Sequence, residues 1–252
     1  MLTHPLFEQL KELRCHGMIE ALSEQLRQQD IGNLSFDERL SLLVERECIE
    51  RENRRLNSRL RQARLKESAC LEDIDYASSR NLSKAVVQQM AECLWISRNQ
   101  NLLITGPTGT GKTYLACAMA NQACRRGFSA RYIRLPRLFQ TLVIAKGDGS
   151  YTKLLTALEK TQLLVIDDWG LAAMNEQQRQ DLLEILDDRH NQSSTIVTSQ
   201  LPVNLWHETI GDMTLGDAIL DSLVHNSHRI ELKGESMRKK QANKLEEKEN
   251  KK

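Results

Sequence analysis

The sequence predicts an α/β fold with a parallel sheet, preceded by an all-helical N-terminal segment. Three observations predict the sheet. A glycine-rich loop, residues 106–113, follows an apolar run at residues 102–104; the apolar run 163–166 ends in two aspartates; and the run 195–198 ends in small polar residues. Strands that alternate with helices along a chain form parallel sheets, which bind ligands at the carboxyl ends of their strands. The polar residues that end these runs are therefore candidate site residues.

The first of these segments has the pattern G-x-x-x-x-G-K-[ST]. Its eight residues are Gly106, Pro107, Thr108, Gly109, Thr110, Gly111, Lys112 and Thr113. Glycines let phosphates approach bare backbone N–H groups, and a helix beginning at Lys112 adds the positive end of its dipole. Lys112 can then reach the β- and γ-phosphates, while the hydroxyl of Thr113 suits Mg²⁺. The motif predicts bound Mg-ATP or Mg-GTP; an accidental glycine-rich turn is the alternative. No N-K-x-D guanine motif occurs, which favours ATP.

The second segment reads as a fully buried strand that delivers Asp167 and Asp168 to the edge of the sheet. We assign Asp167 to Mg²⁺, directly or through water, and Asp168 to polarising the water that attacks the γ-phosphate. An alternative role for Asp168 is the N-cap of the next helix.

The third segment is followed by polar residues at the strand end. Thr198, Ser199 or Gln200 could hydrogen-bond the attacking water or the γ-phosphate, and we take Ser199 as the catalytic candidate. Turn residues that satisfy the local backbone would give the same pattern.

Composition indicates a helix-rich soluble protein: among 252 residues the net charge is +1, with 27% charged and 4% aromatic residues. No run approaches the roughly 18 apolar residues of a membrane span, and no signal-peptide core is present, so we expect a cytoplasmic protein with no membrane partner. The six cysteines form no C-x-x-C pair and are expected to be structural thiols. We divide the chain into residues 1–75, 76–238 and a charged tail, 239–252.

The N-terminal segment shows helical spacing over residues 6–26 and a second helix start at Ser35, where Glu38 completes a capping box. This second helix is expected to reach the sixties. Its later part carries the DNA-binding candidates Arg54, Arg55, Arg59, Arg61 and Arg64.

Two interpretations of this arginine-rich helix remain open. Glu47 and Arg51, like Glu50 and Arg54, have the i,i+4 spacing of solvated ion pairs. Beyond Arg54 no acid follows until Glu67, which favours sequence-neutral contact with DNA phosphates.

Coarser expectations concern the connecting segments. A linker is expected around residues 70–81 and a helix over 83–93. Trp95 or Ile96 could pack on adenine or belong to the core. A strand at 130–133 should precede a helix through residue 142, and residues 146–150 should form a flexible loop, either facing a substrate channel or simply solvated.

Four motifs together carry a resemblance to a known family. They are the glycine-rich loop, DDWG at residues 167–170, TSQLP at 198–202 and HNSHRIELKGESMR at 225–238. With these the chain resembles, over nearly its full length, the IstB-like transposition helper ATPases of the AAA+ class, relatives of DnaC-like helicase loaders. Residues 231–238 are the most discriminating part.

The resemblance implies a helical N-terminal domain and an AAA+ core that assembles with ATP on duplex DNA and stimulates a partner transposase. A helicase loader and a nucleotide-gated DNA scaffold with feeble hydrolysis are the alternatives. In this class an arginine from a neighbouring subunit contacts the γ-phosphate. The expected Asp-Arg-Leu reads Asp-Ser-Leu here, with Ser222 at the arginine position. Either Arg189 or Arg229 could substitute, or hydrolysis is slow. Arg238 matches the second sensor arginine that contacts phosphates in cis; a surface arginine is the alternative.

Overall fold

The computed structural model describes residues 5–76 and 80–237. Its contacts divide the chain into two compact units, residues 1–58 and residues 59–252. The division falls within the long helix α3 (Phe36–Ala63). The functional division predicted from the sequence, at residues 75 and 238, stays a prediction, and its charged tail lies outside the described residues.

The first unit contains helices in the predicted places. They are α1 (Pro5–Glu12), α2 (His16–Gln25) and the start of α3, while the 3-10 turn η1 (Gln29–Asn33) was not predicted. The predicted capping box at Ser35 is confirmed: its backbone N–H donates to the Glu38 carboxylate at 2.7 Å, and the Glu38 N–H donates to the Ser35 hydroxyl at 3.3 Å. These bonds satisfy backbone donors that a helix start leaves without partners.

A glycine and a buried glutamate bring α2 against α3. A Cβ on Gly17 would lie 2.6 Å from the Arg46 carbonyl oxygen, so only glycine permits this approach. The Glu47 carboxylate, 6% exposed, accepts hydrogen bonds from the Gly17 N–H at 2.7 Å and from Arg51 at 2.7 Å. Burial raises the pKa of Glu47, but the bonds from Arg51 and the α2 backbone outweigh it and lower that pKa below its usual value.

The second unit is built on a five-stranded sheet in which every strand pair is parallel, in the order β2-β3-β4-β1-β5. The strands are β1 (Asn101–Thr105), β2 (Ala130–Arg134), β3 (Leu163–Trp169), β4 (Ser194–Ser199) and β5 (Ser227–Glu231). The first four confirm the predicted strands. The edge strand β5 was not predicted, because only Ile230 of its five residues is buried and the segment lacks an apolar run.

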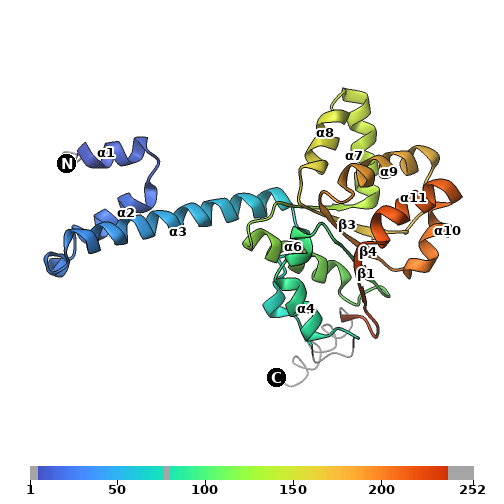
Figure 1. Ribbon diagram of the computed structural model, residues 1–252, viewed down its shortest axis with the longest axis horizontal. Helices are drawn as coiled ribbons and strands as arrows, with labels where there is room; N and C mark the ends of the chain where they lie inside the picture. Colours follow the sequence, from blue (N-terminus) through green and yellow to red (C-terminus); the bar gives the residue numbers. More distant parts are fainter. Residues whose placement is uncertain (1–4, 77–79, 238–252) are drawn as a thin grey trace, which may run out of the picture. The chain divides into compact units, whose positions relative to one another are not determined.

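Helices cover both faces of this sheet (Figure 1). On one face lies α6 (Lys112–Arg125), with α4 (Lys84–Ala91) packed on it. The other face carries α7 (Leu135–Asp148), α8 (Tyr151–Glu159), α9 (Glu176–Arg189) and α11 (Met213–Val224). Short elements complete the unit: η2 (Leu71–Asp73), α5 (Leu94–Ser97), η3 (Val203–Leu205) and α10 (Trp206–Ile210).

The structure corrects one expectation about the connecting segments and decides between the two roles considered for Trp95. Residues 146–148 form the last turn of α7 rather than a flexible loop, because Lys146 pairs with Asp181 at 2.5 Å and Gly149 ends the helix in a left-handed conformation. Trp95 is 3% exposed and its indole N–H donates to the Met90 carbonyl at 3.0 Å, so it belongs to the core. Within residues 5–76 and 80–237, no helix is long and apolar enough to cross a membrane.

Candidate functional site

The glycine-rich loop joins β1 to α6, as the sequence predicts, and its glycines are required by geometry. Gly106, Gly109 and Gly111 have φ values of +144°, +84° and +95°. A Cβ on Gly106 would lie 2.2 Å from the Leu232 carbonyl oxygen, and one on Gly109 would lie 2.2 Å from the Ser236 hydroxyl. Any other residue would therefore be both strained and obstructed, so the loop keeps the bare backbone that phosphate binding requires.

Lys112 begins α6 and folds back over this loop. Its ammonium donates to the Gly106 carbonyl at 2.7 Å and to the Pro107 carbonyl at 2.9 Å. Burial lowers the pKa of Lys112, while Asp167 and Asp168 act in the opposite direction. The lysine thus holds a positive charge at the loop where the sequence predicts phosphates.

Asp167 lies at the centre of a network of hydroxyl groups. The Thr113 hydroxyl is 3.0 and 3.1 Å from its two carboxylate oxygens, and the Tyr132 hydroxyl donates at 2.5 Å. The Thr198 hydroxyl also donates to this carboxylate. Asp167 is fully buried, so these bonds replace the water that a free carboxylate would have. Burial and then the bond to Asp167 raise the pKa of Tyr132, which keeps its hydroxyl a donor.

Asp168 is displaced from the strand ladder by an irregularity in β3. The pairing of β3 with β4 shifts between Ile166 and Trp169, and Asp168 has a φ of +64°. Its carboxylate accepts a hydrogen bond from Arg134 at 2.5 Å, and this bond is the main cause of the raised pKa of Arg134. The N-cap interpretation of Asp168 is wrong, because Asn175 caps the next helix with a full capping box.

The polar residues at the carboxyl end of β4, Thr198, Ser199 and Gln200, make different contacts. Thr198 reaches Asp167, whereas the Ser199 hydroxyl donates to the Trp169 carbonyl at 2.9 Å and accepts from the Leu201 N–H at 3.0 Å. These bonds favour the local backbone role for Ser199 over the catalytic one. Gln200 accepts a hydrogen bond from Thr108 of the loop at 2.6 Å.

Many of these residues line one cleft of about 650 Å³: Thr108, Gly109, Gly111, Lys112, Thr113, Asp168, Thr198, Ser199 and Gln200. Asp167 is fully buried and is not among the lining residues. The cleft also contains side chains that the sequence analysis did not single out: Lys66, Ile74, Arg80, Tyr114 and Arg134. Arg80 braces the loop by donating to the Thr110 carbonyl at 3.2 Å. A single cationic or aromatic residue outside a motif cannot be recognised as a site residue from its neighbours in the sequence. Arg134 is an exception, because its position at the carboxyl end of a strand could have marked it as a candidate.

The donor set of the cleft fits Mg²⁺ and a nucleotide. A threonine hydroxyl and an aspartate carboxylate lie within 3.1 Å of each other, and both are oxygen ligands of the kind that Mg²⁺ prefers. The cleft beside Lys112 is lined by Thr108, Gly109 and Gly111 of the loop, and its volume leaves room for phosphate groups. Among the residues that the structure describes, no cluster of three or more His, Cys, Asp or Glu side chains suggests another kind of metal site.

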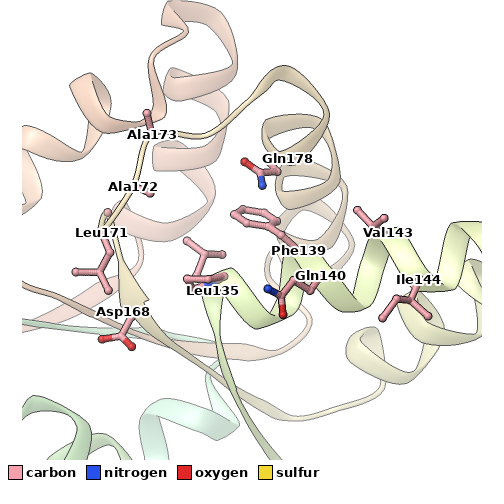
Figure 2. Close-up of a pocket in the computed structure, with 12 residues that line it drawn as sticks. Leu135, Phe139, Gln140, Val143, Ile144, Asp168, Leu171, Ala172, Ala173 and Gln178 are labelled. Carbon is pink, nitrogen blue, oxygen red and sulfur yellow. The ribbon is translucent and has the colours of Figure 1, made fainter.

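An apolar groove of about 570 Å³ adjoins the cleft (Figure 2). Figure 2 shows Leu135, Phe139 and Val143 of α7 on one side, with Leu171 of the loop that follows β3 opposite them. Asp168 and Leu171 line both the groove and the cleft. The two cavities therefore meet at the candidate water-polarising residue.

The arginines considered as γ-phosphate ligands differ in burial and in their contacts. Arg189 is wrong as a substitute for the missing arginine: it is 2% exposed, and its guanidinium donates to the carbonyls of Leu158, Thr161 and Ser194. Burial lowers its pKa to about 9. Arg229 is exposed on β5, and Arg238 lies outside the described residues. Ser222 is half-buried on α11, and its hydroxyl donates to the Ala218 carbonyl at 3.1 Å.

The arginines of α3 and the segment after it also differ. The ion-pair interpretation is confirmed for Arg54, which lies 3.2 Å from Glu47 and 3.7 Å from Glu50. Arg59 donates to the Cys124 carbonyl at 2.8 Å. The remaining DNA-binding candidates are each exposed, and no ion pair to another described residue is found for them: Arg55, Arg61 and Arg64.

Comparison with protein families decides the relationship. The model of the family described as IstB-like ATP binding protein matches residues 8–245. The chain belongs to this family. The resemblance predicted from the four motifs is confirmed.

Two relatives support the membership. A Sinorhizobium fredii protein named insertion sequence ATP-binding protein y4pL is 50% identical over 244 residues, or 97% of this chain and 100% of the relative. An ATP-binding protein of insertion sequence IS1162 from Pseudomonas fluorescens is 51% identical over 203 residues, or 80% of this chain and 88% of the relative.

Solved structures show the fold. The crystal structure of DnaI has a TM-score of 0.57 at 23% identity and covers 66% of this chain and 91% of that chain. The DnaC helicase loader has a TM-score of 0.52 at 19% identity, with 59% and 86% covered. AMPPCP-bound DnaA from Aquifex aeolicus has a TM-score of 0.58 at 21% identity, with 73% and 56% covered. The second unit thus has the AAA+ fold.

Proposed function

We propose that this chain is a cytoplasmic, ATP-dependent helper of DNA transposition that assembles with its own copies on duplex DNA and stimulates a partner transposase. The observation that carries the proposal is the contact between Thr113 and the buried Asp167 beside the glycine-rich loop. Membership in a family of ATP-binding proteins whose relatives are named for insertion sequences supports the biological setting.

In this proposal each residue of the cleft has one task. The loop N–H groups and Lys112 bind the phosphates of ATP, and Thr113 and Asp167 hold Mg²⁺. When bound, Mg²⁺ neutralises charge on the β- and γ-phosphates. Asp168 accepts a hydrogen bond from the attacking water through Oδ1, because Arg134 binds only Oδ2. Thr198 orients Asp167 and replaces Ser199 as the proposed sensor.

DNA contact is assigned to exposed arginines and is expected to be sequence-neutral. Arg55, Arg61 and Arg64 stay candidates because their guanidinium groups are not held by described acids, whereas Arg54 and Arg59 are engaged within the chain. Binding of arginines to DNA phosphates releases cations from the DNA, and this release becomes less favourable as the salt concentration rises. The affinity for duplex DNA should therefore be much lower at about 200 mM salt than at about 50 mM salt.

Light scattering tests the assembly. The protein is sized with duplex DNA and Mg²⁺ in ATP, in ADP and without nucleotide, for wild type, Lys112→Ala and the control Lys153→Ala, whose side chain is exposed on α8. We expect large assemblies only with ATP, in the wild type and the control. Equal sizes in every condition would remove the assembly mechanism. A pull-down with a transposase or with a replicative helicase then separates the proposed partner from the helicase-loader alternative.

Hydrolysis is expected to be slow, because Ser222 stands where the family resemblance implies an arginine. Arginine fingers contribute roughly 10³-fold or more to turnover. Ser222→Arg should therefore raise steady-state ATP turnover by a factor of tens or more in the assembled protein. An unchanged turnover rate, with assembly intact, would show that this position does not serve the γ-phosphate.

A further inference from the structure

Lys66 brings a second lysine to the nucleotide cleft from a segment without a motif. Its side chain lines the cleft together with Lys112 and Thr113 and is 39% exposed. The ammonium lies 3.9 Å from a carboxylate oxygen of Asp167, outside hydrogen-bonding distance. Lys66 is thus close enough to offset the buried negative charge, and it is not fixed by a hydrogen bond to it.

The backbone that carries Lys66 is anchored on α6, the helix that begins at the glycine-rich loop. Burial raises the pKa of the Cys117 thiol on α6, and the neighbouring backbone of Glu67 and Lys66 acts in the opposite direction, so this backbone lies beside the thiol. Farther along, Arg125 of α6 pairs with Glu72 at 2.6 Å. The segment after α3 is therefore held along α6, and this packing directs the flexible side chain of Lys66 toward the cleft.

The other described cations of the cleft are engaged elsewhere. Lys112 binds the loop carbonyls, and Arg80 donates to the carbonyls of Thr110 and Asp75. Arg134 binds Asp168 at 2.5 Å. Among the described lining residues, Lys66 is the cation with the weakest attachment, and its three-donor ammonium on a four-carbon chain can reorient.

We propose that Lys66 is a γ-phosphate-binding residue that acts in cis. Resting on the proposed function, this assignment follows from charge. Asp167 has two lysines near it, Lys112 and Lys66, and only Lys66 is not held by the glycine-rich loop. A Mg²⁺ ion held by Asp167 would take over the role of counter-charge, and the Lys66 ammonium could then bind a phosphate in the cleft that it lines with Lys112 and Thr113. ADP has no γ-phosphate, so this contact would make the cleft prefer ATP over ADP.

Nucleotide affinity tests the assignment without relying on turnover. Binding of a non-hydrolysable ATP analogue and of ADP is measured in Mg²⁺ by calorimetry for wild type, Lys66→Ala, Lys66→Gln and the control Lys153→Ala. A lost charged hydrogen bond corresponds to roughly tenfold or more in affinity. We expect Lys66→Ala and Lys66→Gln to lose roughly tenfold for the analogue and less than about twofold for ADP, with the control unchanged.

Two results would overturn this role. An equal loss for the analogue and ADP would mean that Lys66 supports the site only by offsetting Asp167, and wild-type affinity for both would mean that it has no part in binding. Lys66→Gln keeps the side-chain length and covers the case in which Lys66→Ala does not fold. Lys112→Ala is measured alongside: unchanged binding in that variant would refute the proposed function itself, whatever Lys66 does.

Discussion

Removing the Tyr132 hydroxyl tests whether the hydrogen bonds around Asp167 hold the site together. Tyr132 is 8% exposed and Asp167 is fully buried, so water cannot replace the 2.5 Å bond between them. A hydrogen bond to a charged group contributes about 1.5–3 kcal/mol. Tyr132→Phe should lower the free energy of unfolding by that amount. For a unit of this size, this corresponds to a fall of roughly 3–12 °C in the melting temperature.

A double-mutant cycle isolates the pair. In an Asp167→Asn background the acceptor is neutral, and removing the Tyr132 hydroxyl should lower the free energy of unfolding by only about 1 kcal/mol or less. The two substitutions should therefore be coupled by more than about 0.5 kcal/mol, the difference between these two losses.

Urea unfolding without nucleotide provides the assay, because all 3 tryptophans lie buried in the second unit and report on it alone: Trp95, Trp169 and Trp206. Tyr151→Phe is the control, since its hydroxyl donates at 2.6 Å to the exposed carboxylate of Glu184 and lies at the longer distance of 3.3 Å from the buried carboxylate of Asp181. That variant should show a smaller loss and no coupling to Asp167. Additivity of Tyr132→Phe and Asp167→Asn within about 0.5 kcal/mol would refute the reasoning.

Three further predictions concern Glu47, Gly109 and Arg189. Glu47→Gln should destabilise the helices of residues 5–58 by roughly 1–3 kcal/mol at pH 7. The folded pKa of Glu47 lies below its ordinary value of 4.5, so this contribution is present above pH 4.5 and is lost as the pH falls through the folded pKa. The melting temperatures of wild type and variant, measured by circular dichroism, should therefore converge in acid. A difference that stays constant with pH would contradict this prediction. Gly109→Ala should abolish nucleotide binding in calorimetry, because the Cβ would lie 2.2 Å from the Ser236 hydroxyl at a φ of +84°; wild-type affinity would show that the loop adjusts freely. Arg189→Met should lower the melting temperature while leaving the ATP turnover of the folded protein unchanged, because its guanidinium binds buried carbonyls; a stable but inactive variant would restore a catalytic role.

Local sequence patterns predicted much of the second unit. Buried strands are continuous apolar runs, and the spacing of glycines, Lys112 and Thr113 belongs to one contiguous loop. Asp167 and Asp168 directly follow the apolar run 163–166 near the carboxyl end of β3, so the edge of the sheet on which they lie was also determined. Such features depend on neighbours along the chain, and the family resemblance was carried by the same contiguous motifs.

Tertiary structure decided which side chains complete the site. Tyr132 reaches Asp167 because β2 pairs with β3 in a register that places Arg134 beside Asp167, and no pattern within either strand encodes that register. Lys66 enters the cleft only because its segment packs along α6. Arg189 has the charge of a candidate finger but is buried by segments distant in sequence. Local sequence determines which elements form, whereas register and packing between distant segments determine which charges meet.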